Sequence, residues 1–203
     1  MKSAFRNLVF LLLAFAALSA QAATTARALI EERSKVVLTA LVERRDEFRR
    51  DPATMEAFVR EELGKSFDNE YSARLVLGRH GRGIESAKVV EFADALTLGL
   101  MRRYGKAMLD FEPSMDVRIL GETPLAGGKM VRVSSEILRA TGSPVPVDYM
   151  LRPVGDSFKV FDVIVEGVSY VQTYRAQFEE LLRTKTLDQV IAGLKADTIE
   201  LDG

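Results

Sequence analysis

The chain has 203 residues, no cysteine and one histidine, and its 28 basic residues are almost balanced by 29 acidic ones. This balance argues against a protein that binds nucleic acid non-specifically, because such proteins carry a clear positive excess. Without cysteine no disulfide can form and a zinc site would have no thiolate ligands, so the fold must be stabilised by burial of apolar surface alone.

The first 22 residues are predicted to be a cleavable secretory signal peptide. Lys2 and Arg6 form a short positive region, the stretch LVFLLLAFAAL that follows is entirely apolar, and Ala20 and Ala22 occupy the positions that a signal peptidase reads. The apolar stretch is too short for a membrane span; the alternative is an N-terminal anchor that is retained. Cleavage leaves residues 23–203, a single exported domain with 26 basic and 29 acidic residues and a formal charge of −3.

The mature chain begins with two predicted helices. Between residues 25 and 50, apolar side chains recur near helical spacing with charges between them. The next segment has Asp51 as an N-cap, Pro52 at the first helical position and Gly64 as a stop signal, which together are typical of a helix.

Two more helices are predicted on either side of a glycine-rich turn. The stretch NEYSARLVLG forms a short helix, GRHGRG (residues 78–83) forms the turn, and residues 85–109 form a long helix. The apolar stripe of the long helix consists of Phe92, Leu96, Leu100 and Tyr104.

The apolar period then changes to two, as in half-buried strands. The stretches MDVRIL, KMVRVSSEI and VDYMLR alternate apolar and polar residues, and SFKVFDVIVE is apolar on both faces. Their connectors are short and rich in turn formers, which predicts an antiparallel meander of four strands. Two helices close the chain, each introduced by a capping-box pattern, Ser169 with Gln172 and Thr186 with Gln189. The fold class is therefore α+β, a curved four-stranded antiparallel sheet wrapped by N-terminal and C-terminal helices.

The fourth strand carries a carboxylate among apolar residues. Alternation places Asp162 on one face with Phe158, Val160 and Ile164, opposite a face formed by Phe161, Val163 and Val165. An ionised group there is costly unless it is partnered. Asp162 is then either a catalytic carboxylate with a raised pKa or a structural acceptor for a backbone N–H or for an arginine such as Arg175. The two-sided strand itself either sits between helices in a large core or lines a cavity for a hydrophobic ligand.

The glycine-rich turn contains the single histidine. A serine triad or a zinc site would have to be built around His80, although a lone histidine in a turn is usually a solvated surface residue. Arg79, His80 and Arg82 could also form a cradle for an anion, with a basic helix-to-helix turn as the alternative.

Several stretches together resemble a known family. VLGRH, RRYGKAML, FDVIVEGVSYVQTYRAQF and LLRTKTLDQVIAGLK follow one another in order, and VEGVS followed by LLRTK is the most specific part. This pattern resembles the MlaC family of periplasmic phospholipid-binding proteins, also called the toluene-tolerance family, over nearly the whole mature chain. The sequence departs from the family pattern at Gly81 and Phe158, where an aromatic residue and a tryptophan are common.

The resemblance implies a monomeric, non-enzymatic carrier without a cofactor or metal. Such a carrier shuttles a phospholipid between an outer-membrane lipoprotein–porin complex and the substrate-binding ring of an inner-membrane ABC transporter, and so maintains the lipid asymmetry of the outer membrane. The acyl tails lie in a deep apolar pocket between sheet and helices. One tail needs a slot of about 15 Å, half of a bilayer core, in a chain whose radius of gyration is about 16 Å.

The residues predicted to contact the lipid tails come from the helices, the sheet and the corner between the last strand and the following helix. They are Leu75, Leu96, Leu100, Tyr104, Val131, Val133, Tyr149, Leu151, Val163, Val165, Tyr170 and Tyr174. Two alternatives stay open: a periplasmic hydrolase that uses Asp162 and His80, and an adaptor protein with a filled core and no ligand.

Overall fold

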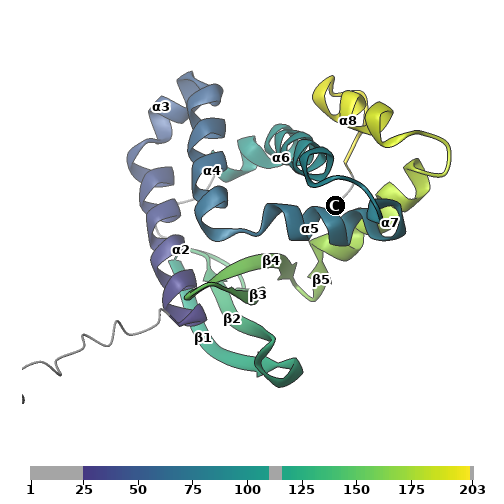
Figure 1. The fold of residues 1–203 in the computed structure, drawn as a ribbon. Helices are drawn as coiled ribbons and strands as arrows, with labels where there is room; N and C mark the ends of the chain where they lie inside the picture. Colours follow the sequence, from purple (N-terminus) through teal and green to yellow (C-terminus); the bar gives the residue numbers. More distant parts are fainter. Residues whose placement is uncertain (1–24, 110–115, 202–203) are drawn as a thin grey trace, which may run out of the picture.

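The computed structural model describes residues 25–109 and 116–201, so the predicted signal peptide lies outside the described residues. Helices come first in the chain, the sheet follows, and two helices close the chain (Figure 1). The elements before the sheet are α2 (Ala26–Glu43), α3 (Arg45–Arg50), α4 (Pro52–Ser66), α5 (Asn69–Leu77), the 3₁₀ turn η1 (Gly78–Gly81) and α6 (Ser86–Leu109). No helix in this part of the chain is both long and apolar enough to cross a membrane.

The N-terminal helices differ from the prediction in two places. The segment predicted as one helix over residues 25–50 is divided at Arg44, whose φ of −104° and ψ of 12° interrupt the helical backbone. Asp51 is the N-cap of α4, as predicted, and accepts a hydrogen bond from the Ala53 N–H at 3.1 Å. The predicted stop at Gly64 is wrong, because α4 continues to Ser66. The chain leaves this helix by pairing with the sheet, since the Asp68 N–H donates to the Val160 carbonyl at 2.8 Å.

The predicted antiparallel meander is confirmed, with a short fifth strand added at its end. The strands are neighbours in chain order: β1 (Asp116–Leu125), β2 (Met130–Leu138), β3 (Val145–Val154), β4 (Ser157–Val165) and β5 (Val168–Ser169). Gly167 has a φ of +84°, a conformation that favours glycine, and so permits the tight turn between β4 and β5. The closing helices are α7 (Tyr170–Leu181) and α8 (Leu187–Lys195).

A bulge in β4 corrects the predicted division of its two faces. Leu151 pairs with Val160 and Tyr149 pairs with Val163, so two steps along β3 correspond to three steps along β4, and Phe161 is the extra residue. Because Tyr149 and Leu151 share a face, Val160 and Val163 share it too. Asp162 pairs with Met150 and therefore lies on the opposite face of the sheet from Val160. The prediction from simple alternation, which placed the two residues on one face, is wrong.

The buried residues form three clusters. The largest joins α5, α6, α7 and α8, where Phe92 and Phe178 pack edge to face with ring centroids 5.0 Å apart. A second cluster packs the first turns of α2 against the sheet, and a third joins α2, α3 and α4 to each other and to α6. Figure 1 shows the same division, with α2 running beside the sheet and α5 to α8 grouped beyond the end of β4 and β5.

Candidate functional site

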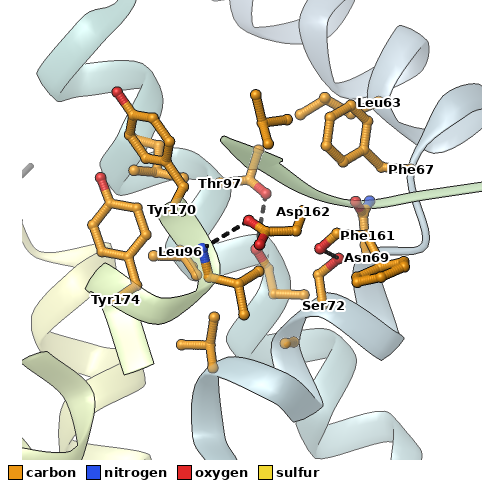
Figure 2. Close-up of a pocket in the computed structure, with 16 residues that line it drawn as sticks. Leu63, Phe67, Asn69, Ser72, Leu96, Thr97, Phe161, Asp162, Tyr170 and Tyr174 are labelled. Atoms are coloured by element: carbon orange, nitrogen blue, oxygen red, sulfur yellow. Dashed lines mark hydrogen bonds between the residues drawn. The ribbon is translucent and has the colours of Figure 1, made fainter. Parts of the chain in front are cut away.

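An apolar hollow of about 270 Å³, which we call the β4–α7 hollow, lies where β4, α5, α6 and α7 meet. Figure 2 shows its lining, with Tyr170 and Tyr174 on one side, Leu63 and Phe67 on the other, and Asp162 between them. The lining residues are Leu63, Phe67, Asn69, Ser72, Ala73, Val76, Ala93, Leu96, Thr97, Leu100, Phe161, Asp162, Val163, Tyr170, Val171 and Tyr174. Most of this surface is hydrocarbon, as expected of a site for an apolar ligand.

A second apolar hollow of about 260 Å³, the α2–α4 hollow, lies between the α2 and α4 helices and the sheet. Its lining residues are Ile30, Arg33, Ser34, Val37, Leu38, Phe58, Val59, Glu62, Leu63, Ser66, Phe67, Val117, Ile137, Tyr149 and Val160. Leu63 and Phe67 line both hollows, so the end of α4 stands between them. Two adjoining apolar spaces therefore run along the helical side of the sheet.

The carboxylate of Asp162 is satisfied within the wall of the β4–α7 hollow. It accepts a hydrogen bond from the Ser169 hydroxyl at 2.6 Å and another from the Val171 N–H at 3.1 Å. Ser169 is also the N-cap of α7 and accepts from the Gln172 N–H. The carboxylate thus lies at the N-terminal end of α7, where the helix dipole favours negative charge. The sequence left Asp162 as either a catalytic carboxylate or a structural acceptor, and these contacts support the structural acceptor. One partner is a backbone N–H, as expected, and the other is the Ser169 hydroxyl instead of Arg175.

Tyrosine hydroxyls lie at the other side of this hollow. The Tyr174 hydroxyl donates to that of Tyr104 at 3.4 Å, and the centroid of the Tyr170 ring lies 6.0 Å from that of the Tyr174 ring. Burial raises the pKa of Tyr174, and the Tyr104 hydroxyl adds to that effect. Burial also raises the pKa of Tyr170. Both phenols are therefore neutral at physiological pH and can offer hydrogen bonds at the edge of an apolar space.

Charged side chains meet at the α2–α4 hollow. Glu62 is only 8% exposed, and its carboxylate lies 3.4 Å from the Arg33 guanidinium and 2.8 Å from the Lys65 ammonium. The Arg33–Glu62 pair joins α2 to α4 across the rim of the hollow. Tyr149 lies deeper, where burial raises the pKa of its hydroxyl, while hydrogen bonds with Ser34 and Ser135 act in the opposite direction.

A third hollow of about 560 Å³ lies between α3, α4 and the C-terminal part of α6. Its lining includes the charged residues Arg49, Glu56 and Arg102 as well as Phe48 and Met55. It contains none of the residues predicted to bind lipid and does not touch the sheet, so its size alone does not make it the better candidate.

The predicted lipid-contacting residues are only partly brought together. Five of them line the β4–α7 hollow, namely Leu96, Leu100, Val163, Tyr170 and Tyr174, and Tyr149 lines the α2–α4 hollow. Val131, Val133 and Leu151 instead pack in the core between the sheet and α2. Leu75 packs against the C-terminal helical cluster, Tyr104 reaches Tyr174 from outside the lining, and Val165 is half-buried opposite Val147.

Sequence reasoning missed the contribution of α2 and α4. The apolar stripes that contain Val37, Phe58 and Leu63 look like ordinary core positions in the sequence. Only the placement of the two helices over the sheet reveals the space beneath them. Phe67 follows the end of α4 and carries no sequence signal of its own. The width of the apolar stripe on α4, with Met55, Phe58, Val59 and Leu63 at helical spacing, was the one available clue.

The described residues do not assemble the alternative catalytic site. His80 lies in η1, where the Arg79 Nε lies 3.3 Å from its Nε2, and it is absent from the lining that contains Asp162. The turn is held to α7, because Arg79 pairs with Glu179 at 3.0 Å. Among the residues described, no group of three or more histidine, aspartate or glutamate side chains is arranged to hold a metal ion.

Comparison with known proteins identifies the family. The sequence profile of the MlaC protein family matches residues 31–196, most of the chain. The chain belongs to the MlaC family. It is also 25% identical over 191 residues to the toluene tolerance protein Ttg2D of Pseudomonas putida, and the match covers 93% of this chain and 87% of that protein. The resemblance stated from sequence is confirmed.

A solved structure shares the fold of this MlaC family member. It is that of a phospholipid-binding protein from Ralstonia solanacearum, determined in complex with a phospholipid. The two chains superpose with a TM-score of 0.75 at 19% sequence identity, over 84% of this chain and 95% of the other. This similarity confirms the α+β fold, an antiparallel sheet with helices on its N-terminal and C-terminal sides.

Proposed function

We propose that this protein is a periplasmic phospholipid carrier. It takes a phospholipid from an outer-membrane lipoprotein complex and exchanges it with an inner-membrane ABC transporter, which maintains the lipid asymmetry of the outer membrane. The observation that carries the proposal is the pair of adjoining apolar hollows on the helical side of the sheet, in a chain of the MlaC family. By its family the chain is a non-enzymatic lipid-binding carrier.

The energetics of such a carrier follow from the hollows. Each buried methylene contributes about 0.8 kcal/mol relative to water, so a phospholipid with two tails is held strongly against loss to solvent. The same tails are equally well shielded in a bilayer, so transfer between membrane and protein is close to neutral. The protein then needs no nucleotide of its own, and the direction of transfer is set by its partners.

The test is native mass spectrometry of residues 23–203, purified without detergent and followed by lipid extraction. We expect one bound mass that matches a diacyl phospholipid. A bare protein mass that stays unchanged after mixing with phospholipid vesicles would overturn the carrier proposal and leave the ligand-free adaptor.

A charge inside the β4–α7 hollow should abolish lipid retention. Val163 is half-buried and lines this hollow, so Val163→Lys places an ammonium where the tail would lie, and burying it without a partner is costly. Val168→Lys is the matched control, because Val168 is 58% exposed just beyond the same strand. Normal lipid loading of a folded Val163→Lys variant would remove Val163 from the site.

A further inference from the structure

The wall between the two hollows is formed by two side chains, one helical turn apart. Leu63 and Phe67 line both spaces, and both are only half-buried although they lie inside the molecule, because they face open space on either side. We call this pair the partition.

The main chain of the partition is fixed. The Phe67 N–H donates to the Leu63 carbonyl at 2.7 Å, and Phe67 also forms an isolated bridge with Val160 of β4. The adjacent Asp68 N–H donates to the Val160 carbonyl at 2.8 Å. The end of α4 is therefore attached to β4, on the edge that β5 leaves unpaired, and the partition stands between the two hollows.

Each hollow has room for part of one acyl tail. The two hollows are similar in size, about 270 and 260 Å³, and each is lined mostly by apolar side chains. Two tails joined to one glycerol need two slots that adjoin, which is the arrangement on the two sides of the partition.

We propose that the β4–α7 hollow and the α2–α4 hollow each receive one acyl tail, and that Phe67 and Leu63 keep the tails apart. This inference rests on the proposed function, since it assigns the two tails of the same cargo. The number of acyl tails that the protein binds then depends on the partition and on the two hollows. The α2 and α4 helices also contact the lipid, although none of the residues predicted to contact the tails lies on them.

The experiment fills one hollow at a time. Val37→Trp fills the α2–α4 hollow and Leu100→Trp fills the β4–α7 hollow, because both side chains are half-buried in the lining. The matched controls are Val36→Trp and Val90→Trp, on the same two helices, where the side chains are 36% and 43% exposed. Each protein is incubated with vesicles of palmitoyl-oleoyl phosphatidylethanolamine and phosphatidylglycerol, or separately with oleic acid, and its bound lipid is counted by native mass spectrometry.

The proposal predicts different stoichiometries for the two probes. The wild-type protein and both controls should carry one diacyl phospholipid or two oleates. Each filled variant should lose diacyl occupancy at least tenfold and bind one oleate. Wild-type occupancy by the diacyl lipid in either filled variant would place both tails in the other hollow and overturn the inference, while leaving the carrier function intact.

The oleate count of the wild-type protein tests the inference without any substitution. A maximum of one oleate per chain, in a protein that does load diacyl phospholipid, would overturn it even if the filled variants failed to fold. A wild-type protein that binds neither probe would overturn the proposed function itself, so the two failures are distinguishable.

Discussion

The α6, α7 and α8 helices are packed differently from α2 and α4. Around α6, α7 and α8 the core is closed: Phe92, Phe178 and Val190 are fully buried, and the guanidinium of Arg102 donates to the carbonyls of Leu194 and Lys195 at the end of α8. We call α6, α7 and α8 the C-terminal frame. Most of its apolar surface is used for packing, but the sides of α6 and α7 that face β4 line the β4–α7 hollow.

The α2–α4 pair uses its apolar surface in another way. The first turn of α2 packs on the sheet through Ala26, Leu29 and Ile30, but further along Val37 and Phe58 are only half-buried because a hollow lies beneath them. The least tightly packed elements are the ones that open at the lowest free energy. The C-terminal frame therefore combines a closed core with one wall of the β4–α7 hollow, whereas α2 and α4 mainly cover the α2–α4 hollow.

The largest difference between the two regions should be seen when one phenylalanine is removed from each. Phe178→Ala deletes a fully buried ring that packs against Phe92, and such substitutions lower the free energy of unfolding by about 3–5 kcal/mol. Phe58→Ala removes a half-buried ring stacked 5.6 Å from Phe48, so we expect less than half that loss. Urea unfolding followed by circular dichroism measures both. Equal losses would mean that α2 and α4 are packed as tightly as the frame.

The contrast between the C-terminal frame and the α2–α4 pair was only partly visible in the sequence. Period-two alternation located the strands, and the pairs Asp51–Pro52 and Thr186–Gln189 located helix starts, because these signals act within a few residues. The bulge at Phe161 gave no signal, since β4 is apolar on both faces and either register looks equally good. The role of Phe67 depends on where α4 ends against β4, a tertiary relation that local patterns do not encode.

A smaller effect is expected where β4 joins the C-terminal frame. Asp162→Ala leaves the Ser169 hydroxyl and the Val171 N–H without their acceptor at the wall of the hollow, which should cost about 1–3 kcal/mol of stability. Asp162→Asn keeps one acceptor oxygen and should lose less. Thermal unfolding of the two variants beside the wild type measures the difference. If the alanine variant were as stable as the wild type, the carboxylate would not be the structural link between β4 and α7.

The smallest effect should come from the exposed ion pairs that join α6 to α8. Hydrogen bonds from Lys195 and Lys88, each at 2.7–2.8 Å, lower the pKa of Glu91 from its usual 4.5 to about 2. A carboxyl whose pKa is depressed in the folded state stabilises the fold above pH 4.5 and loses that contribution as the pH falls towards 2. The network is solvent-exposed, so its contribution should be small and should weaken in 1 M salt.

Glu91→Gln removes this titration, and the control is Glu85→Gln, at an exposed residue directly before α6. The unfolding free energies of wild type and Glu91→Gln should differ at pH 6 in low salt and converge near pH 2, while the control follows the wild type throughout. A difference that persisted at pH 2 or in 1 M salt would mean that Glu91 acts through packing rather than through its charge. In that case α6 and α8 would be held together by buried contacts alone. The α2 and α4 helices would then differ more clearly from the C-terminal frame, because the Arg33–Glu62 ion pair joins them at the α2–α4 hollow.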